Sequence, residues 1–458
     1  MIPLWLGLFE SKKFYEQQAQ VQAIKYFTWA IAANPRLAEA YGARAKAKFE
    51  LEKKKGTKAD FSDALKDVTK AIELEPKVLS YYDTRQSINH VAKKYRDELA
   101  DVDHLIQTDR PNISYLNSRA YIYELLGESQ LALADRETMI ESLTNISLSR
   151  GKRWSVDYVT RAQQYKFTGQ FDKAIADYES AVKEEPNPYY GLDYALDLGR
   201  LSESTGRDSQ AIASYTKIID ASKDSKDSSG SDASRTDQAR QRRANLYLKH
   251  GQYAKALADA DEMIKYSDGD LRHAFRIKIL GLMGQQDRAK SEIQSKLGSF
   301  NEFANDTAEN KADRYSARAS FYAELGEFKN AMRDYSTALS LDPNPSRSSA
   351  CAQMYCKLAD YDNAIKYYNR TITESTDESE LQKAYDGRAE VHLLVNKPEL
   401  SVQDCNKSIG LDNPDFRTAA APYHWRALAY KKLGKGALAK FDQDQSIALN
   451  FSPEPELD

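Results

Sequence analysis

The sequence predicts an all-α fold, a solenoid of stacked helix pairs joined by short turns. Two observations predict it: one pattern of small, aromatic and charged residues recurs along the chain, and hardly any stretch alternates as a strand would. Residues 158–186 and 315–343 carry the same pattern, with Tyr, Arg-Ala, Tyr, Gly, Ala, Asp-Tyr, Ala and Pro at matching positions. Such self-similarity along the chain indicates units that stack on their neighbours.

Each copy predicts a first helix, a turn and a second helix. Small residues anchor both helices of a pair and let them approach closely. Gly recurs at the turn, where the left-handed backbone that ends a helix suits Gly best. The first-helix anchors are Ala45, Gln86, Ala120, Ala162, Gly199, Ala244, Ile277, Ala319, Ala352, Ala389 and Ala427, and the turn glycines are Gly127, Gly169, Gly206, Gly251, Gly284, Gly326 and Gly434.

A twelfth, degenerate copy precedes these eleven and is recognisable from Ala23, Phe27 and Pro35. About twelve copies therefore cover nearly the whole chain. The polar tract SKDSKDSSGSDASRT, residues 222–236, is poor in apolar side chains and is predicted to be a flexible linker or insertion. The resulting division is a first block at 1–221, the linker at 222–236, a second block at 237–450 and a tail at 451–458.

The pattern resembles the W-x2-L-G-x2-Y…A-x3-F…P frame of the tetratricopeptide repeat, a helix-turn-helix unit of ~34 residues. The resemblance implies a right-handed superhelix whose first helices line a concave groove. It also implies that protein partners, often extended peptides or helices, bind in that groove.

Two charges recur together across the copies. An Arg precedes the first-helix anchor and an acid lies on the second helix in nine copies, and both are absent in three. We therefore predict a structural ion pair between the helices of each unit, with the planar guanidinium on the carboxylate. The pairs are Arg44–Asp67, Arg85–Asp101, Arg119–Asp135, Arg161–Asp177, Arg243–Asp259, Arg276–Glu292, Arg318–Asp334, Arg388–Asp404 and Arg426–Asp442; the copies without them carry Glu10 and Tyr26, Leu198 and Ser214, and Cys351 and Tyr367.

No catalytic residue, cofactor or metal site is predicted. The six histidines are scattered along the chain without metal-ligand spacing, and phosphate-binding glycine loops are missing. The net charge of −3 favours neither nucleic acid nor an anionic membrane. No stretch has the ~20 apolar residues of a membrane span. We expect a cytoplasmic protein with reduced thiols, although residues 2–9 leave open a removed or truncated targeting segment.

The groove-facing positions of the middle copies are polar and mildly basic. They carry Arg200, Arg242, Asn245 and Lys278, with Phe275 and Lys249 beside them, and a second candidate surface carries Trp425 and Lys431. This balance suits an acidic or carboxylate-bearing peptide, and a merely solvated helix face explains it equally well. The Lys and Asn clamp of chaperone-tail binders has no full match, since copy eight has Phe275 where an Asn is needed.

The sequence thus favours a non-enzymatic scaffold that binds protein partners in its groove. A first alternative is a substrate-recruiting or regulatory subunit of an enzyme complex. A second is an enzyme whose site is hidden in the groove. The identity of the partner and the oligomeric state stay open.

Overall fold

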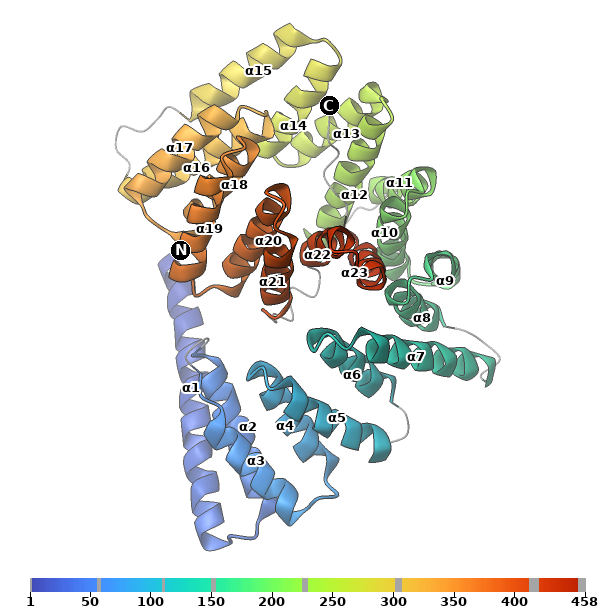
Figure 1. Ribbon diagram of the computed structural model, residues 1–458, viewed down its shortest axis with the longest axis vertical. Coiled ribbons are helices and arrows are strands. Elements are labelled where there is room, and N and C mark those ends of the chain that lie inside the picture. The colour runs from blue at the N-terminus through green and yellow to red at the C-terminus, as the bar shows by residue number, and fades with distance from the viewer. Residues whose placement is uncertain are drawn as a thin grey trace. The chain divides into compact units, whose positions relative to one another are not determined.

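The computed structural model describes residues 2–55, 59–108, 112–149, 154–224, 230–300, 307–411 and 420–451. These residues form 23 α-helices and no strand (Figure 1). The first twelve helices are α1 (Ile2–Ala33), α2 (Ala38–Lys53), α3 (Ser62–Leu74), α4 (Leu79–Val91), α5 (Tyr95–Thr108), α6 (Ile113–Leu125), α7 (Ser129–Ser149), α8 (Ser155–Phe167), α9 (Phe171–Glu184), α10 (Pro188–Ser204), α11 (Asp208–Asp224) and α12 (Gly230–Lys249). The others are α13 (Tyr253–Tyr266), α14 (Asp270–Leu282), α15 (Gln286–Ser299), α16 (Ala308–Glu324), α17 (Phe328–Leu341), α18 (Pro345–Lys357), α19 (Tyr361–Glu374), α20 (Glu378–Leu394), α21 (Pro398–Ile409), α22 (Ala421–Lys432) and α23 (Gly436–Ala448).

From α2 onward the helices form eleven consecutive pairs, one for each predicted anchor. The degenerate first copy differs from expectation, because α1 is a single helix of 32 residues without an internal turn. No Gly or Pro lies between the predicted helices of that copy after Gly7, so nothing in its sequence ends the first helix.

The turns within the pairs use the left-handed backbone that the glycines predict. Gly169 has φ 71° and Gly326 has φ 79°. Three copies without this Gly keep the same conformation, with Lys93, Ala359 and Asn396 at φ 56°, 59° and 56°. Stacking of the pair therefore imposes the turn even where the residue does not favour it.

The chain divides into two compact units, Met1–Ser142 and Leu143–Asp458, so that the division falls within α7. The tract at 222–236 is mostly helical where the structure describes it: α11 continues to Asp224 and α12 begins at Gly230. Arg235 and Thr236 are buried. Residues 225–229, and residues 452–458 of the predicted tail, lie outside the described ranges, and the division into two blocks at this tract stays a prediction.

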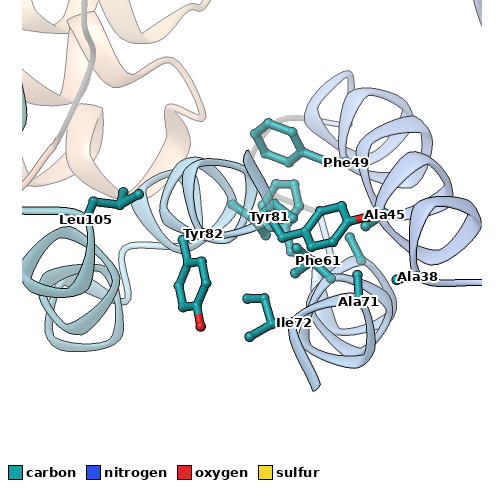
Figure 2. Packing of buried hydrophobic residues seen from close by; sticks show 12 residues of the cluster. Ala38, Ala45, Phe49, Phe61, Ala71, Ile72, Tyr81, Tyr82 and Leu105 are labelled. Atoms are coloured by element: carbon teal, nitrogen blue, oxygen red, sulfur yellow. The ribbon is translucent and has the colours of Figure 1, made fainter. Parts of the chain in front are cut away.

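The core of the first unit shows how the pairs pack. The anchors Ala45 and Ala64 are buried where α2 and α3 cross, and larger aromatic residues such as Phe49, Phe61 and Tyr81 surround them (Figure 2). Tyr81 belongs to α4, the next helix, so the same cluster joins one pair to the following one. The core of α2–α3 therefore continues into the next pair, as expected of a solenoid.

Candidate functional site

Each predicted pair of Arg and acid is in contact. In α8–α9, Arg161 donates from Nε to Asp177 Oδ2 and from Nη2 to Asp177 Oδ1, both at 2.7 Å. Arg161 is only 8% exposed. The hydrogen bonds to Asp177, together with the charge of the Asp177 carboxylate, raise the pKa of the Arg161 guanidinium above its ordinary value. The other eight pairs also join the two helices of their unit.

A second bond, which the sequence analysis missed, ties many of these arginines to the preceding pair. The Nη1 atom of Arg243 donates to Thr216 Oγ1 of α11 at 2.9 Å, and Nη1 of Arg426 donates to Asn406 Oδ1 of α21 at 2.7 Å. The acceptor lies two residues after the acid position of the preceding copy, so a polar residue there is the signal that predicts it. Acceptors at this position are Thr28, Asp103, Thr216, Asp261, Asn369 and Asn406.

The pair α10–α11 has neither charge and packs differently. Leu198 takes the place of the Arg and is buried. The ring of Tyr215 is fully buried against Gly199, where a Cβ atom would lie 2.5 Å from Tyr215 Cε1. The hydroxyl of Tyr215 donates to Glu203 Oε2 at 2.6 Å. Tyr178 is buried at the same position of α8–α9, so the pair α10–α11 differs in lacking the ion pair and in having Gly199, which lets the tyrosine ring approach closely.

The predicted groove arginines lie on consecutive first helices and already have partners. Arg200 of α10 donates from Nη2 to Gln238 Oε1 at 2.6 Å, while its Nε atom has no acceptor among the described residues. Arg242 of α12 donates from Nη1 to Glu203 Oε2 at 3.1 Å. Lys278 of α14 is half-buried and forms no ion pair with a described residue. The surface is therefore less basic than its sequence suggests.

The other predicted groove residues of this region, Asn245, Lys249 and Phe275, differ in their surroundings. Asn245 accepts a bond from Gln241 of its own helix at 3.4 Å, and Lys249 forms an ion pair with Asp208 at 2.8 Å. Phe275 is 7% exposed and packs in the core cluster with Ala244 and Ile279, so its ring is not available to a partner. The apolar ring turns toward the core of the preceding pair because burial there removes it from water.

The second predicted surface lies on α22. Trp425 is half-buried, and its ring meets His424 edge-on at a centroid distance of 4.9 Å. His424 in turn stacks on Phe451 at 4.2 Å. Lys431 is exposed. The aromatic residues therefore form a small cluster near the end of the described chain, and Lys431 and Lys432 are exposed on the same helix.

A lysine on the first helix α8 is buried. Lys166 is buried, and burial lowers the pKa of its ammonium to about 8, with the charge of Asp197 opposing the shift. Its neighbour Gln164 is buried as well. This end of the first-helix surface is covered by other parts of the chain.

The described residues hold no cluster of three His, Cys, Asp or Glu side chains placed to bind a metal. Cys351, Cys356 and Cys405 are all unpaired thiols. Burial raises the pKa of Cys351 and of Cys356 to about 11, and raises that of Cys405 further. No helix in the described part of the chain has the length and apolar character needed to cross a bilayer.

Comparison with known proteins identifies the repeat. Family models described as tetratricopeptide repeat match residues 159–226, 312–345 and 348–381. The chain is 26% identical over 202 residues to human tetratricopeptide repeat protein 6, covering 43% of this chain and 35% of that protein. It is 21% identical over 287 residues to chicken DnaJ homolog subfamily C member 3, covering 61% of this chain and 52% of that protein. The matches thus span about a third and about half of these relatives.

Among solved structures, yeast Tom70 is similar at 13% identity, with 94% of each chain covered and a TM-score of 0.34. The family matches agree with the succession of helix pairs, with the left-handed turns and with the small residues at each crossing. The chain is a tetratricopeptide repeat protein of the all-α solenoid class.

Proposed function

We propose that this chain is a non-enzymatic scaffold that holds an acidic segment of a partner protein on α10, α12 and α14. Membership of the tetratricopeptide repeat family supports a role in protein interaction. The finer proposal concerns Arg200, Arg242 and Lys278, with Asn245 beside them. These side chains come from three consecutive first helices, the elements that line the groove in this family.

The observation that carries the proposal is the incomplete bonding of these cations. Arg200 keeps one N–H donor without an acceptor, and Lys278 forms no ion pair with a described residue. A buried donor without an acceptor costs ~1–3 kcal/mol. A carboxylate from a partner can relieve that cost when the guanidinium turns toward it, which makes an acidic segment the favoured ligand.

The internal partners of the arginines limit the affinity. A ligand must compete with Glu203 for Arg242 and with Gln238 for Arg200. Because one bond replaces another, each contact contributes about 0.2–1 kcal/mol, as partly exposed ion pairs do. We therefore expect binding that several weak contacts share and that salt weakens.

The test uses a fluorescein-labelled peptide of twelve glutamates, with a glutamine peptide of equal length as the ligand control. Binding to the full chain is followed by fluorescence anisotropy. We expect the glutamate peptide to bind, and the variant Arg200→Glu, Arg242→Glu, Lys278→Glu to weaken binding by roughly tenfold or more, from three contacts of ~0.5 kcal/mol each. Helicity should stay unchanged.

A matched control carries the same change in net charge on second helices. Lys329, Arg333 and Lys366 are exposed on α17 and α19, and their replacement by Glu should leave the affinity within about twofold of the wild type. The neutral variant Arg200→Gln, Arg242→Gln, Lys278→Gln avoids repulsion with Glu203 and should also bind weakly. Equal loss in the groove variant and in the control variant would place the binding surface elsewhere, and the Trp425 surface would be the next to test.

We also propose that the chain works in a reducing compartment such as the cytoplasm. All three cysteines are unpaired, and two of them are buried. Oxidising compartments favour disulfides, so unpaired thiols fit a reducing one.

A further inference from the structure

The last helix of the second unit packs against the first helix pair of that unit. Gln445 of α23 donates from Nε2 to the backbone oxygen of Phe167 in α8 at 3.0 Å, across 278 residues of sequence. Ile447 packs against the buried cluster of α8–α10 that includes Ala162 and Leu201. Figure 1 shows α23, in red, beside α8 and α10, in green.

Comparison among the copies shows that this contact buries a second-helix position that is exposed in most other copies. Gln445 lies three residues after the acid of its copy, Asp442, and is 1% exposed. Most of its counterparts, among them Lys70, Thr138, Glu262 and Lys407, are exposed. The position faces solvent in these pairs, and α8 covers it in the last one.

The junction between α23 and α8 differs from those between successive pairs. At many successive junctions, the Arg of one pair donates from Nη1 to the residue two positions after the preceding acid. Asp444 holds that position in α23, but Nη1 of Arg161 donates instead to Thr144 of α7. Asp444 pairs with Lys440 of its own helix. Among the described residues, the closure includes an amide bond and an apolar contact, and Nη1 of Arg161 makes no bond to Asp444.

The α8–α9 turn also makes a contact that the other turns lack. A Cβ atom on Gly169 would lie 2.7 Å from Asp444 Oδ2 and 3.1 Å from Asp444 Cγ. At the other turn glycines with positive φ, nothing in the described chain lies within 4 Å of that point. Gly206, at φ 75°, is the matched case.

We propose that the surface formed by α8, the α8–α9 turn and α10 is a helix-binding site and that α23 is its ligand, so that the second unit has a closed state and an open state. The occupant is α23 of the same chain. Its polar bond and the missing Arg bond suit a contact that opens and closes, since many of the successive junctions have an additional bond from a guanidinium. The test needs no partner, so its outcome is independent of the proposed function.

The first experiment places a disulfide across the closure. The 3.1 Å separation matches the roughly 3 Å between a Cβ atom and the far sulfur of a disulfide. The full chain with Gly169→Cys and Asp444→Cys is oxidised by glutathione disulfide, which takes two electrons from the two thiols and yields two molecules of glutathione. The native cysteines should react slowly because their thiol pKa values are raised.

We expect an intrachain disulfide, detected by intact mass after alkylation, to form at least tenfold faster than with Gly206→Cys and Asp444→Cys. Both variants place Cys in a left-handed turn, so strain in the turn cancels. Equal rates, or disulfide-linked dimers instead of an intrachain product, would overturn the proposal.

The second experiment measures the closed state. In the Gly169→Cys, Asp444→Cys background, the ratio of disulfide to dithiol in a glutathione buffer gives the effective concentration of the two thiols. Adding Gln445→Ala should lower it by roughly 2- to 12-fold, the range expected for one hydrogen bond. Adding Lys407→Ala, the exposed counterpart, should leave it unchanged. Equal effective concentrations in these two variants would contradict the role of Gln445 in holding the closed state.

Discussion

The pairs α8–α9 and α10–α11 are neighbours in the chain and are held together by different means. In α8–α9 a buried guanidinium grips a carboxylate through two bonds. In α10–α11 a leucine and a serine take those positions, and a tyrosine buried over a glycine fills the crossing. Both pairs belong to the same compact unit, and in both the two helices are joined by a left-handed turn, at Gly169 and at Gly206.

This difference shows that the two helices of a pair can be held together either with the ion pair or with uncharged residues at both of its positions. Well-packed apolar groups often replace a buried ion pair without loss of stability, whereas half of an ion pair is costly. Arg161 and Asp177 are present together, and Leu198 and Ser214 replace both. We infer that the joint presence and absence in the sequence reflects the cost of an unpaired buried charge.

The largest expected effect comes from breaking one clamp. Arg161→Ala leaves the buried carboxylate of Asp177 without its guanidinium, which should destabilise α8–α9 by about 3–5 kcal/mol. Local stability is best measured by native-state hydrogen exchange of the α8 and α9 amides, because a long repeat array does not unfold in two states. Exchange in α2–α3 serves as an internal reference.

The matching control replaces both members of the ion pair with the uncharged residues found in α10–α11. Arg161→Leu with Asp177→Ser copies the residues of α10–α11 and should recover most of the lost stability. If the double variant is as unstable as Arg161→Ala, the two arrangements are not interchangeable and the comparison fails.

The next largest effect on stability is expected at Asp386, a carboxyl group that has no arginine partner among the described residues. Asp386 in α20 has a buried Oδ1 atom without a hydrogen-bond partner among the described residues, and burial raises its pKa to about 7. Its stabilising contribution is complete below about pH 4 and is lost as the pH rises through about 7. Asp386→Asn should therefore be more stable than the wild type at pH 8, on the order of 3 kcal/mol, and nearly equal at pH 4.

The measurement is thermal or denaturant unfolding of both proteins at several pH values between 4 and 8, followed by circular dichroism. The difference between variant and wild type isolates this carboxyl from other titrating groups. A difference that does not change with pH would show that Asp386 ionises at its ordinary pKa.

The smallest effect is expected from a substitution that tests the close packing of Tyr215 against Gly199. Gly199→Ala places a Cβ atom 2.5 Å from the buried ring of Tyr215, and such overpacking should cost about 1–3 kcal/mol. Gly281→Ala is the matched control, since it is also in a helix but meets nothing within 4 Å, and should stabilise α14 by roughly 0.5–1 kcal/mol. Hydrogen exchange in α10 and α14 distinguishes the two, and equal effects would argue against a role for close approach.

The repeat pattern predicted the helix pairs and the contact of each Arg with its acid because both depend on residues within one unit. Groove contacts were harder to predict. Glu203 meets Arg242 from the neighbouring pair, and it was not among the positions of the repeat pattern considered. Phe275 occupies the same place in its copy as Arg242 does, yet an aromatic ring there turns into the core.

The contact of α23 with α8 could not be predicted from the repeats at all. Periodicity describes how each pair meets its neighbours, whereas Gln445 and Phe167 belong to the last pair and the fourth. The one polar residue that made the difference, Gln445, looks like any solvent-facing position when its copy is considered alone.

The second bond of the arginines bears on how the molecule resists force. Each Nη1 bond ties a first helix back to the second helix of the preceding pair. Once α23 has separated from α8, a pull on the two ends therefore loads these bonds in series. Leu198 leaves the boundary between α9 and α10 without such a tie. Under tension in an optical trap, the chain should therefore yield at this boundary before the one between α11 and α12, where Arg243 holds Thr216.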